Sequence, residues 1–266
     1  MESENQTELE APTPPSEHIV GDPPQMSEVA TLGNIFFEPG NTFEDLRRKP
    51  RFIIGSIIIA LLVTAYGFAL YYKVGDQGYR RFAAEQMDKS PQTQGMSAEQ
   101  KSDAIDLQMK IGAGVRYGMP ILVFISLLIG GLLYWLGAKA FGGTGTFLHS
   151  LSVWVYSTLP PAIVGMIANV VILFFKSVDE IDIGASQRGV VTANPSFLMD
   201  GKASPVLATV IATFDLFFIW GWILAAIGLR ITNRISSGSA WAIVLILALV
   251  GTALRVIGAL FSGNVS

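Results

Sequence analysis

The chain has 266 residues, of which 51% are hydrophobic and only 15% are charged, whereas about 25% of residues are charged in ordinary soluble domains. The hydrophobic residues come in long blocks, so the composition predicts a polytopic membrane protein. The absence of cysteine excludes disulfides, thiolate nucleophiles and cysteine metal sites. His18 and His149 lie far apart in the sequence, which argues against a histidine metal site.

Residues 1–25 are rich in acidic residues and proline and contain almost no hydrophobic side chains. Such a segment cannot bury enough apolar surface to fold, so we expect a disordered tail. It also lacks the basic start and apolar core of a secretory signal. A solvated tail and a partner-binding tail both fit this composition.

Residues 26–51 are predicted to form amphipathic helices at the membrane interface. Apolar residues in 26–37 recur on one helical face until the Pro39-Gly40 turn, which predicts a short helix lying on the membrane. Residues 42–45 match a capping box and predict the start of a second short helix. A basic cluster then precedes the first hydrophobic block: Arg47, Arg48, Lys49 and Arg51. This cluster indicates a cytoplasmic N-terminus, and it could also hold anionic lipid headgroups at about 1 kcal/mol per base.

Five hydrophobic blocks are long enough to cross a bilayer as helices. They cover about residues 52–72, 119–136, 147–175, 205–229 and 241–261, and a short tail, 262–266, follows. This count predicts an all-α five-helix bundle with the N-terminus in the cytoplasm and the C-terminus outside.

The polar segment 73–118 between the first two blocks is too long for a simple turn. Its capping box at residues 97–100 and the periodic apolar residues that follow predict that both helices extend outward as an antiparallel hairpin. We interpret this outer hairpin as a structural cap over the bundle rather than a ligand site.

The third hydrophobic block contains Pro160 and Pro161, which lack the backbone donors that a helix needs. The pair predicts a kink or an interruption, tolerated where neighbouring helices or a cavity satisfy the freed carbonyls. A packing kink and a helix that lines a substrate or ion path both remain open. His149, in the first turn of this block, is expected to be a structural residue near the cytoplasmic surface.

Asp215 and Arg255 are charged residues inside the last two blocks. A bare carboxylate at the centre of a bilayer costs about 2.5 to 3.5 kcal/mol on insertion scales, so Asp215 should face other helices. The two residues lie at similar depth, and our hypothesis is an ion pair that joins the last two helices. In the alternative, Arg255 extends outward to the interface while Asp215 bonds hydroxyl groups of the third block, such as those of Tyr156, Ser157 and Thr158.

Three sequence blocks resemble the Yip family, the Ypt/Rab-interacting membrane proteins, in its bacterial form. The first covers Ile35-Phe36-Phe37-Glu38-Pro39 and Leu46-Arg47-Arg48-Lys49-Pro50. The second runs from the glycine-rich loop at 141–147 to Leu159-Pro160. The third starts at Phe214-Asp215-Leu216-Phe217 and ends at Gly228-Leu229. Together the blocks extend the resemblance over most of residues 31–261.

The resemblance implies a five-helix membrane protein with a cytoplasmic N-terminus. Eukaryotic relatives bind prenylated Rab GTPases in vesicle traffic, but the Asp-Leu-Tyr-Gly-Pro motif of that branch is missing before the first block. Binding of a Rab-type GTPase is therefore not expected here. The long outer hairpin also departs from the eukaryotic pattern and points to a bacterial cytoplasmic (inner) membrane.

These features favour a non-enzymatic membrane scaffold or adaptor, with the lipid bilayer and other membrane proteins as partners and with no role for nucleic acid. The alternative is a small transporter or channel that uses the broken third block and Asp215. An intramembrane aspartyl enzyme would need paired carboxylates, and Asp215 is the only acid in any block. We expect no catalytic residue, no cofactor and no metal.

Overall fold

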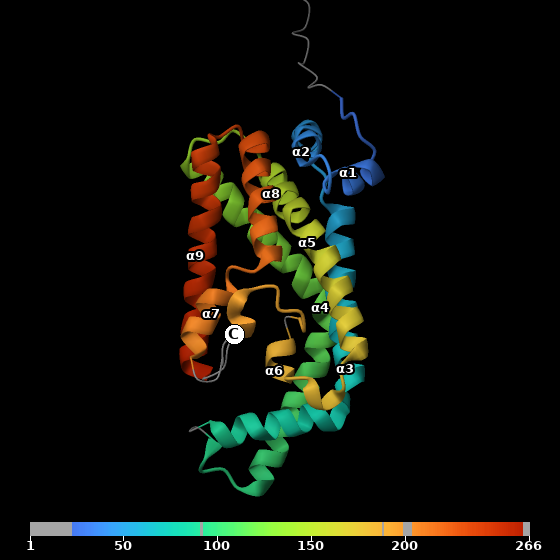
Figure 1. Ribbon diagram of the computed structural model, residues 1–266, viewed down its shortest axis with the longest axis vertical. Coiled ribbons are helices and arrows are strands. Elements are labelled where there is room, and N and C mark those ends of the chain that lie inside the picture. Colours follow the sequence, from blue (N-terminus) through green and yellow to red (C-terminus); the bar gives the residue numbers. More distant parts are fainter. Residues whose placement is uncertain (1–22, 91–92, 188, 199–203, 263–266) are drawn as a thin grey trace, which may run out of the picture.

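The computed structural model describes residues 23–90, 93–187, 189–198 and 204–262 (Figure 1). All regular elements in these residues are helices. In chain order they are α1 (Glu28–Asn34), α2 (Pro39–Arg48), α3 (Ile53–Lys89), α4 (Ala98–Ala140), α5 (Phe147–Phe175), η2 (Val178–Glu180), α6 (Ile183–Ser186), η3 (Pro195–Leu198), α7 (Pro205–Ala212), α8 (Leu216–Asn233) and α9 (Ser237–Ser262). Five of them, α3, α4, α5, α8 and α9, are long and apolar enough to cross a membrane. The predicted all-α polytopic bundle is confirmed, whereas the predicted disorder of the tail concerns residues that lie largely outside the described ones.

Helix α5 lies at the centre of the bundle, where it packs against α3, α4 and α8 (Figure 1). Glycines let the neighbouring backbones approach it closely. A Cβ atom added to Gly131 of α4 would lie 2.8 Å from Leu151 Cα, and one added to Gly55 of α3 would lie 2.8 Å from Val155 Cγ1. Such close contacts matter in lipid, because packing rather than hydrophobic exclusion drives the association of membrane helices.

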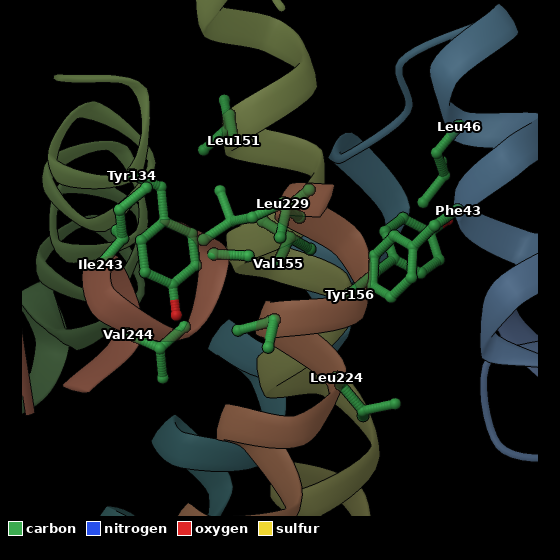
Figure 2. Close-up of a cluster of buried hydrophobic side chains, with 14 of the residues drawn as sticks. Phe43, Leu46, Tyr134, Leu151, Val155, Tyr156, Leu224, Leu229, Ile243 and Val244 are labelled. Carbon is green, nitrogen blue, oxygen red and sulfur yellow. The ribbon is translucent and has the colours of Figure 1, made fainter. Parts of the chain in front are cut away.

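The buried core joins the membrane helices to α2 (Figure 2). Tyr134, Val155 and Leu229 fill the space between α4, α5 and α8, and Phe43 and Leu46 reach into the same cluster from α2. Phe43 and Leu46 are fully buried. Helix α2 is therefore part of the packed structure rather than an adsorbed surface helix.

The start of α2 corrects one prediction for the N-terminal segment. The helix begins at Pro39 rather than at the predicted capping box, because Pro39 and Gly40 form its first turn and Thr42 bonds the Glu38 carbonyl at 3.0 Å. Helix α2 packs on the ends of α8 and α5, and its place at the membrane interface stays a prediction. Phe43 of α2 contacts Gly228 of α8, where an added Cβ would lie 2.7 Å from Phe43 Cε1.

The predicted helical hairpin is present. Helix α3 continues to Lys89, α4 starts at Ala98, and Ser97 and Gln100 form the predicted capping box. Arg80 of α3 bonds Asp106 of α4 at 2.6 Å and so bridges the two arms. Gly75 has φ 76 and ψ 166, and the arm of α3 beyond it turns across the end of the bundle (Figure 1). Pro91, which divides the polar segment 73–118 in the sequence, lies outside the described residues.

Helix α5 runs through Pro160 and Pro161 as one helix, so the third block is not interrupted there, and the predicted kink stays a prediction. Both prolines are buried, and α8 packs next to the Ser157 carbonyl, which loses its helical donor to Pro161. An added Cβ on Gly221 of α8 would lie 3.5 Å from the Ser157 carbonyl oxygen and 3.8 Å from Pro161 Cγ. Helix α8 therefore packs closely against α5 at the point where the prolines remove backbone donors.

The break occurs instead in the fourth block, which was predicted as one helix over 205–229. Helix α7 ends at Ala212, and α8 begins at Leu216. Asp215 is the residue that caps the second of these helices. The helix predicted for the fourth block is therefore interrupted next to Asp215, the acid inside this block.

The contact between α2 and α8 generates a first prediction. Replacing Gly228 by alanine inserts a methyl group against Phe43 and Val153, so we expect it to lower the free energy of unfolding by about 1 to 3 kcal/mol. The same change at Gly251 of α9 meets no atom within 4 Å and should stabilise its helix by up to about 1 kcal/mol. Equal thermal unfolding midpoints of the two variants in detergent would contradict the docking of α2.

Candidate functional site

Asp215 lies at the N-terminus of α8 and is 9% exposed. Its Oδ1 accepts the Phe217 backbone N–H at 2.9 Å, which is the geometry of an N-cap. The positive end of the α8 dipole favours a negative charge at this position. Asp215 precedes Asn233, the last residue of α8, by 18 residues, or about 27 Å along the helix, so it lies toward the far side of a hydrocarbon layer about 30 Å thick.

The second carboxylate oxygen of Asp215 binds the segment 189–194, called the strap below. Asp215 Oδ2 accepts the Ala193 backbone N–H at 3.1 Å and the Asn194 side-chain N–H at 3.0 Å. The Leu216 backbone N–H donates in turn to the Ala193 carbonyl at 3.1 Å. A single carboxylate therefore orients three N–H donors and ties the connection between α5 and α7 to the start of α8.

Asn169 of α5 holds the other end of the strap. Its Oδ1 accepts the Val191 backbone N–H at 2.8 Å, while its Nδ2 donates to the Gly165 carbonyl at 2.8 Å. Gly189 has φ 138, a backbone conformation that favours glycine, and an added Cβ there would lie 2.7 Å from Asn169 Oδ1. Asn169 lies six residues, or about 9 Å, before the end of α5, so the strap reaches into the bundle.

Hydroxyl groups continue this polar cluster toward α9. The Thr213 and Thr252 hydroxyl oxygens lie 3.1 Å apart, which joins the end of α7 to α9. The fully buried Thr209 hydroxyl has no hydrogen-bond partner among the described atoms. The cluster thus connects α5, α7, α8 and α9 through side chains that a hydrocarbon environment would otherwise exclude.

Neither predicted arrangement includes the contacts that Asp215 makes with the strap. The Arg255 guanidinium carbon lies 5.3 Å from the centre of the Phe218 ring. The hydroxyls of Ser157 and Thr158 bond the Trp154 carbonyl instead of Asp215. The helix break makes Asp215 a cap whose oxygens accept donors of Phe217 and the strap, and the pair with Arg255 stays a prediction. A sequence read as one continuous helix cannot reveal such a cap.

Sequence reasoning also missed Asn169, Asn194 and Gly189. One signal was present: an aspartate after Thr213-Phe214 and before a long apolar run fits a helix N-cap as well as it fits an intramembrane charge. Asn169 was a second signal, because an amide inside an apolar block needs a partner. The strap itself was not predictable, since it depends on contacts between segments far apart in the chain.

Arg51 occupies a second buried polar site, at the opposite end of the bundle. Its Nη1 lies 3.2 Å from Asp45 Oδ2 and 2.6 Å from Thr31 Oγ1, and its Nη2 donates to the Met26 carbonyl at 2.7 Å. The Arg51 and Asp45 side chains are only 8% and 1% exposed. The expectation that Arg51 faces lipid headgroups is therefore wrong: it joins α1 and α2 to the start of α3.

The other three bases of the predicted cluster have different surroundings. Arg47 is half-buried and pairs with Glu44 at 2.8 Å, and the Arg48 Nε atom is buried without a partner. Lys49 is exposed. His149 lies next to this cluster: its Nε2 is 3.0 Å from the Arg47 carbonyl and its Nδ1 is 2.7 Å from Thr146 Oγ1. These contacts link the end of α2 to the first turn of α5, as expected of a structural histidine.

The arrangement does not resemble a catalytic centre. Within the described ranges, no group of three or more His, Asp or Glu side chains is placed to hold a metal ion. Asp215 faces backbone and amide donors rather than a nucleophile or a second acid. Its geometry is that of a connector between segments.

Fold and site define a multi-pass α-helical membrane protein with a discontinuous fourth span held by an internal carboxylate. The family model described as the Yip1 domain matches residues 33–259, and the chain belongs to this family. It is 30% identical over 241 residues to "Membrane protein YknW" of Bacillus subtilis (strain 168), an alignment that covers 90% of this chain and 93% of the relative. No solved structure matches. The family resemblance drawn from sequence is confirmed.

The role of Asp215 can be tested by removing its oxygens. We expect Asp215→Ala to lower the free energy of unfolding by about 1 to 3 kcal/mol, because three N–H donors lose their acceptor. Amide hydrogen exchange at Ala193 and Phe217 should accelerate, whereas Asp215→Asn, which keeps one acceptor oxygen, should have a smaller effect. Glu180→Gln is the control, since Glu180 bonds the backbone and side chain of nearby Ser177 and none of its described bonds involves the strap. Unchanged exchange in Asp215→Ala would show that the strap does not depend on this carboxylate.

The Arg51 site gives a third prediction. Arg51→Met leaves Asp45 buried without its cation, which should lower the free energy of unfolding by about 3 to 5 kcal/mol. The double variant Asp45→Asn with Arg51→Met should recover much of this loss, because no unpaired charge remains. Lys49→Met, which removes an exposed base two residues away, serves as the matched control. A loss in Lys49→Met as large as in Arg51→Met would contradict a specific buried pair.

Proposed function

We propose that this protein is a non-enzymatic membrane scaffold or adaptor. The observation that supports this function best is that the Asp215 carboxylate is fully used in hydrogen bonds within the protein. Its two oxygens accept three N–H groups of the same chain. A carboxylate used in this way stabilises a fixed arrangement of helices. A coupling site in a transporter would instead have to exchange protons or ions during its cycle.

The surface proposed for partners is the N-terminal layer formed by α1 and α2. This layer is rigidly attached through the Arg51 site and the Phe43 contact, yet it leaves apolar side chains in solvent. Val29 and Phe37 are 78% and 85% exposed. A fixed platform with exposed apolar groups fits the docking of another membrane protein, and nothing supports a Rab-type GTPase or nucleic acid as the partner.

The proposed location is a bacterial cytoplasmic (inner) membrane, with the N-terminus in the cytoplasm and the C-terminus outside. The basic cluster before the first span and the arginines after the fourth support this orientation. Arg47, Arg48, Lys49, Arg51, Lys139, Arg230 and Arg234 lie at one end of the bundle, while Lys73, Arg116 and Lys176 adjoin the spans at the other end. Residues 26–51 would then form a cytoplasmic layer on a membrane domain of residues 52–261. The hairpin of α3 and α4 would project outside.

A small transporter or channel is the second candidate, and one observation favours it. The break between α7 and α8, together with the strap, resembles the discontinuous helices that form substrate sites in transporters. In this alternative the strap would move to expose Asp215. The proline pair of α5 no longer supports the alternative, because α5 is continuous there.

Ion and tracer flux in liposomes distinguishes the two functions. We expect folded protein to give no flux above empty liposomes under a pH gradient or a membrane potential, with the same result for Asp215→Asn. A photo-cross-linking residue at Phe37 should instead capture a defined membrane protein in cells, whereas one at Leu249, a 69% exposed residue of α9, should not. Flux that disappears in Asp215→Asn would contradict the scaffold and make Asp215 a coupling residue.

A further inference from the structure

Two connections meet at the end of the bundle that carries α2: residues 141–146 between α4 and α5, and residues 234–236 between α8 and α9 (Figure 1). The Thr144 backbone N–H donates to the Asn233 carbonyl at 3.0 Å. An added Cβ on Gly143 would lie 3.1 Å from Ile235 Cγ2. The two connections are therefore in direct contact and form one surface.

Three cations surround this surface. Lys139 is in the last turn of α4, and its ammonium bonds the Gly143 carbonyl at 3.1 Å, on the first connection. Arg230 is in the last turn of α8, Arg234 follows the end of that helix, and both are exposed. None of the ion pairs among described residues includes any of these cations. Residues 137–150 and 228–240 contain no acid, so the two connections and the helix ends next to them carry only positive charge.

Arg234 has an unusual backbone for its residue type. It has φ 54 and ψ 42, and among the described residues it is the one non-glycine with positive φ. Glycine is the residue that adopts this conformation without strain at the end of a helix. Stability alone therefore favours glycine at position 234, and a strained residue of this kind is a reason to look for a function of its side chain.

The neighbouring side chains place the three cations at the level of lipid headgroups. Phe141 and Trp241 flank the surface and are 45% and 38% exposed, as aromatic residues at a membrane interface commonly are. Helix α4 packs against α9, and Leu136 of α4 and Leu245 of α9 are 51% and 45% exposed. An acyl chain could lie along these leucines while its phosphate reaches the cations.

We propose that Lys139, Arg230 and Arg234 bind the phosphate of an anionic phospholipid from the surrounding bilayer. The two arginines supply planar N–H donors for phosphate oxygens, and Lys139 adds a third cation across the connection. The apolar wall below the cations favours a lipid over a soluble phosphate. This site differs from the basic cluster at residues 47–51, and it does not depend on whether the protein is a scaffold or a transporter.

The test measures which lipids stay with the full-length protein extracted from bilayers of phosphatidylcholine and phosphatidylglycerol. We expect wild type to enrich phosphatidylglycerol, and Arg230→Gln or Arg234→Gly each to reduce the enrichment about five-fold. Arg234→Gly also relieves the strained backbone, so its thermal midpoint in pure phosphatidylcholine should equal or exceed that of wild type. Its loss of phosphatidylglycerol could then not be attributed to misfolding.

Arg81→Gln is the matched control, because Arg81 is an exposed helical arginine on the hairpin at the other end of the bundle. It should retain the wild-type enrichment. Equal enrichment in wild type, Arg230→Gln and Arg234→Gly would overturn the proposal, as would an equal loss in Arg81→Gln. Glycerol 3-phosphate, added to protein in pure phosphatidylcholine, should leave the thermal midpoint unchanged. If glycerol 3-phosphate raised the thermal midpoint as much as phosphatidylglycerol does, the cations would instead bind a soluble phosphate.

Discussion

The hydrocarbon layer offers no water to a polar group, so every donor and acceptor within it must find a partner in the protein. Asp215 shows how this chain meets that requirement. Its carboxylate accepts the Phe217 N–H, which the start of α8 leaves without a partner in the helix, and it also accepts the Ala193 backbone N–H and the Asn194 side-chain N–H of the strap. The acid and the break therefore depend on each other. Without the acid the freed N–H groups would lack an acceptor, and without the break the acid would lack donors.

The same principle explains the proline pair of α5. Two consecutive prolines remove two backbone donors, yet α5 continues, and Gly221 lets α8 pack next to the Ser157 carbonyl, one of the two that lose a donor. The strap, held by Asn169, covers a later part of α5. In this bundle, the places where a helix lacks backbone hydrogen bonds are thus covered by neighbouring segments.

A buried charge pair organises the other end of the molecule. Arg51 and Asp45 gather α1, α2 and the start of α3, and Phe43 inserts between α5 and α8 beside Gly228. The bases that remain on the surface of that end lie on α2, α4 and α8. Burial therefore divides a basic region that is uniform in sequence into a structural part and an exposed part, and only the exposed part can meet lipid or a partner.

The sequence by itself determined the membrane class, the five spans, the capped hairpin and the family, because these depend on hydrophobic length, local capping and short motifs. It also identified Asp215 as the residue to explain, because a lone acid in an apolar run is costly. Only the tertiary structure decided which block is broken, that Asp215 binds a strap, and that Arg51 is buried. Those outcomes depend on contacts between Asn169, residues 189–194 and α8, or between α2 and α8. No local periodicity encodes such contacts, because their residues are far apart in the chain.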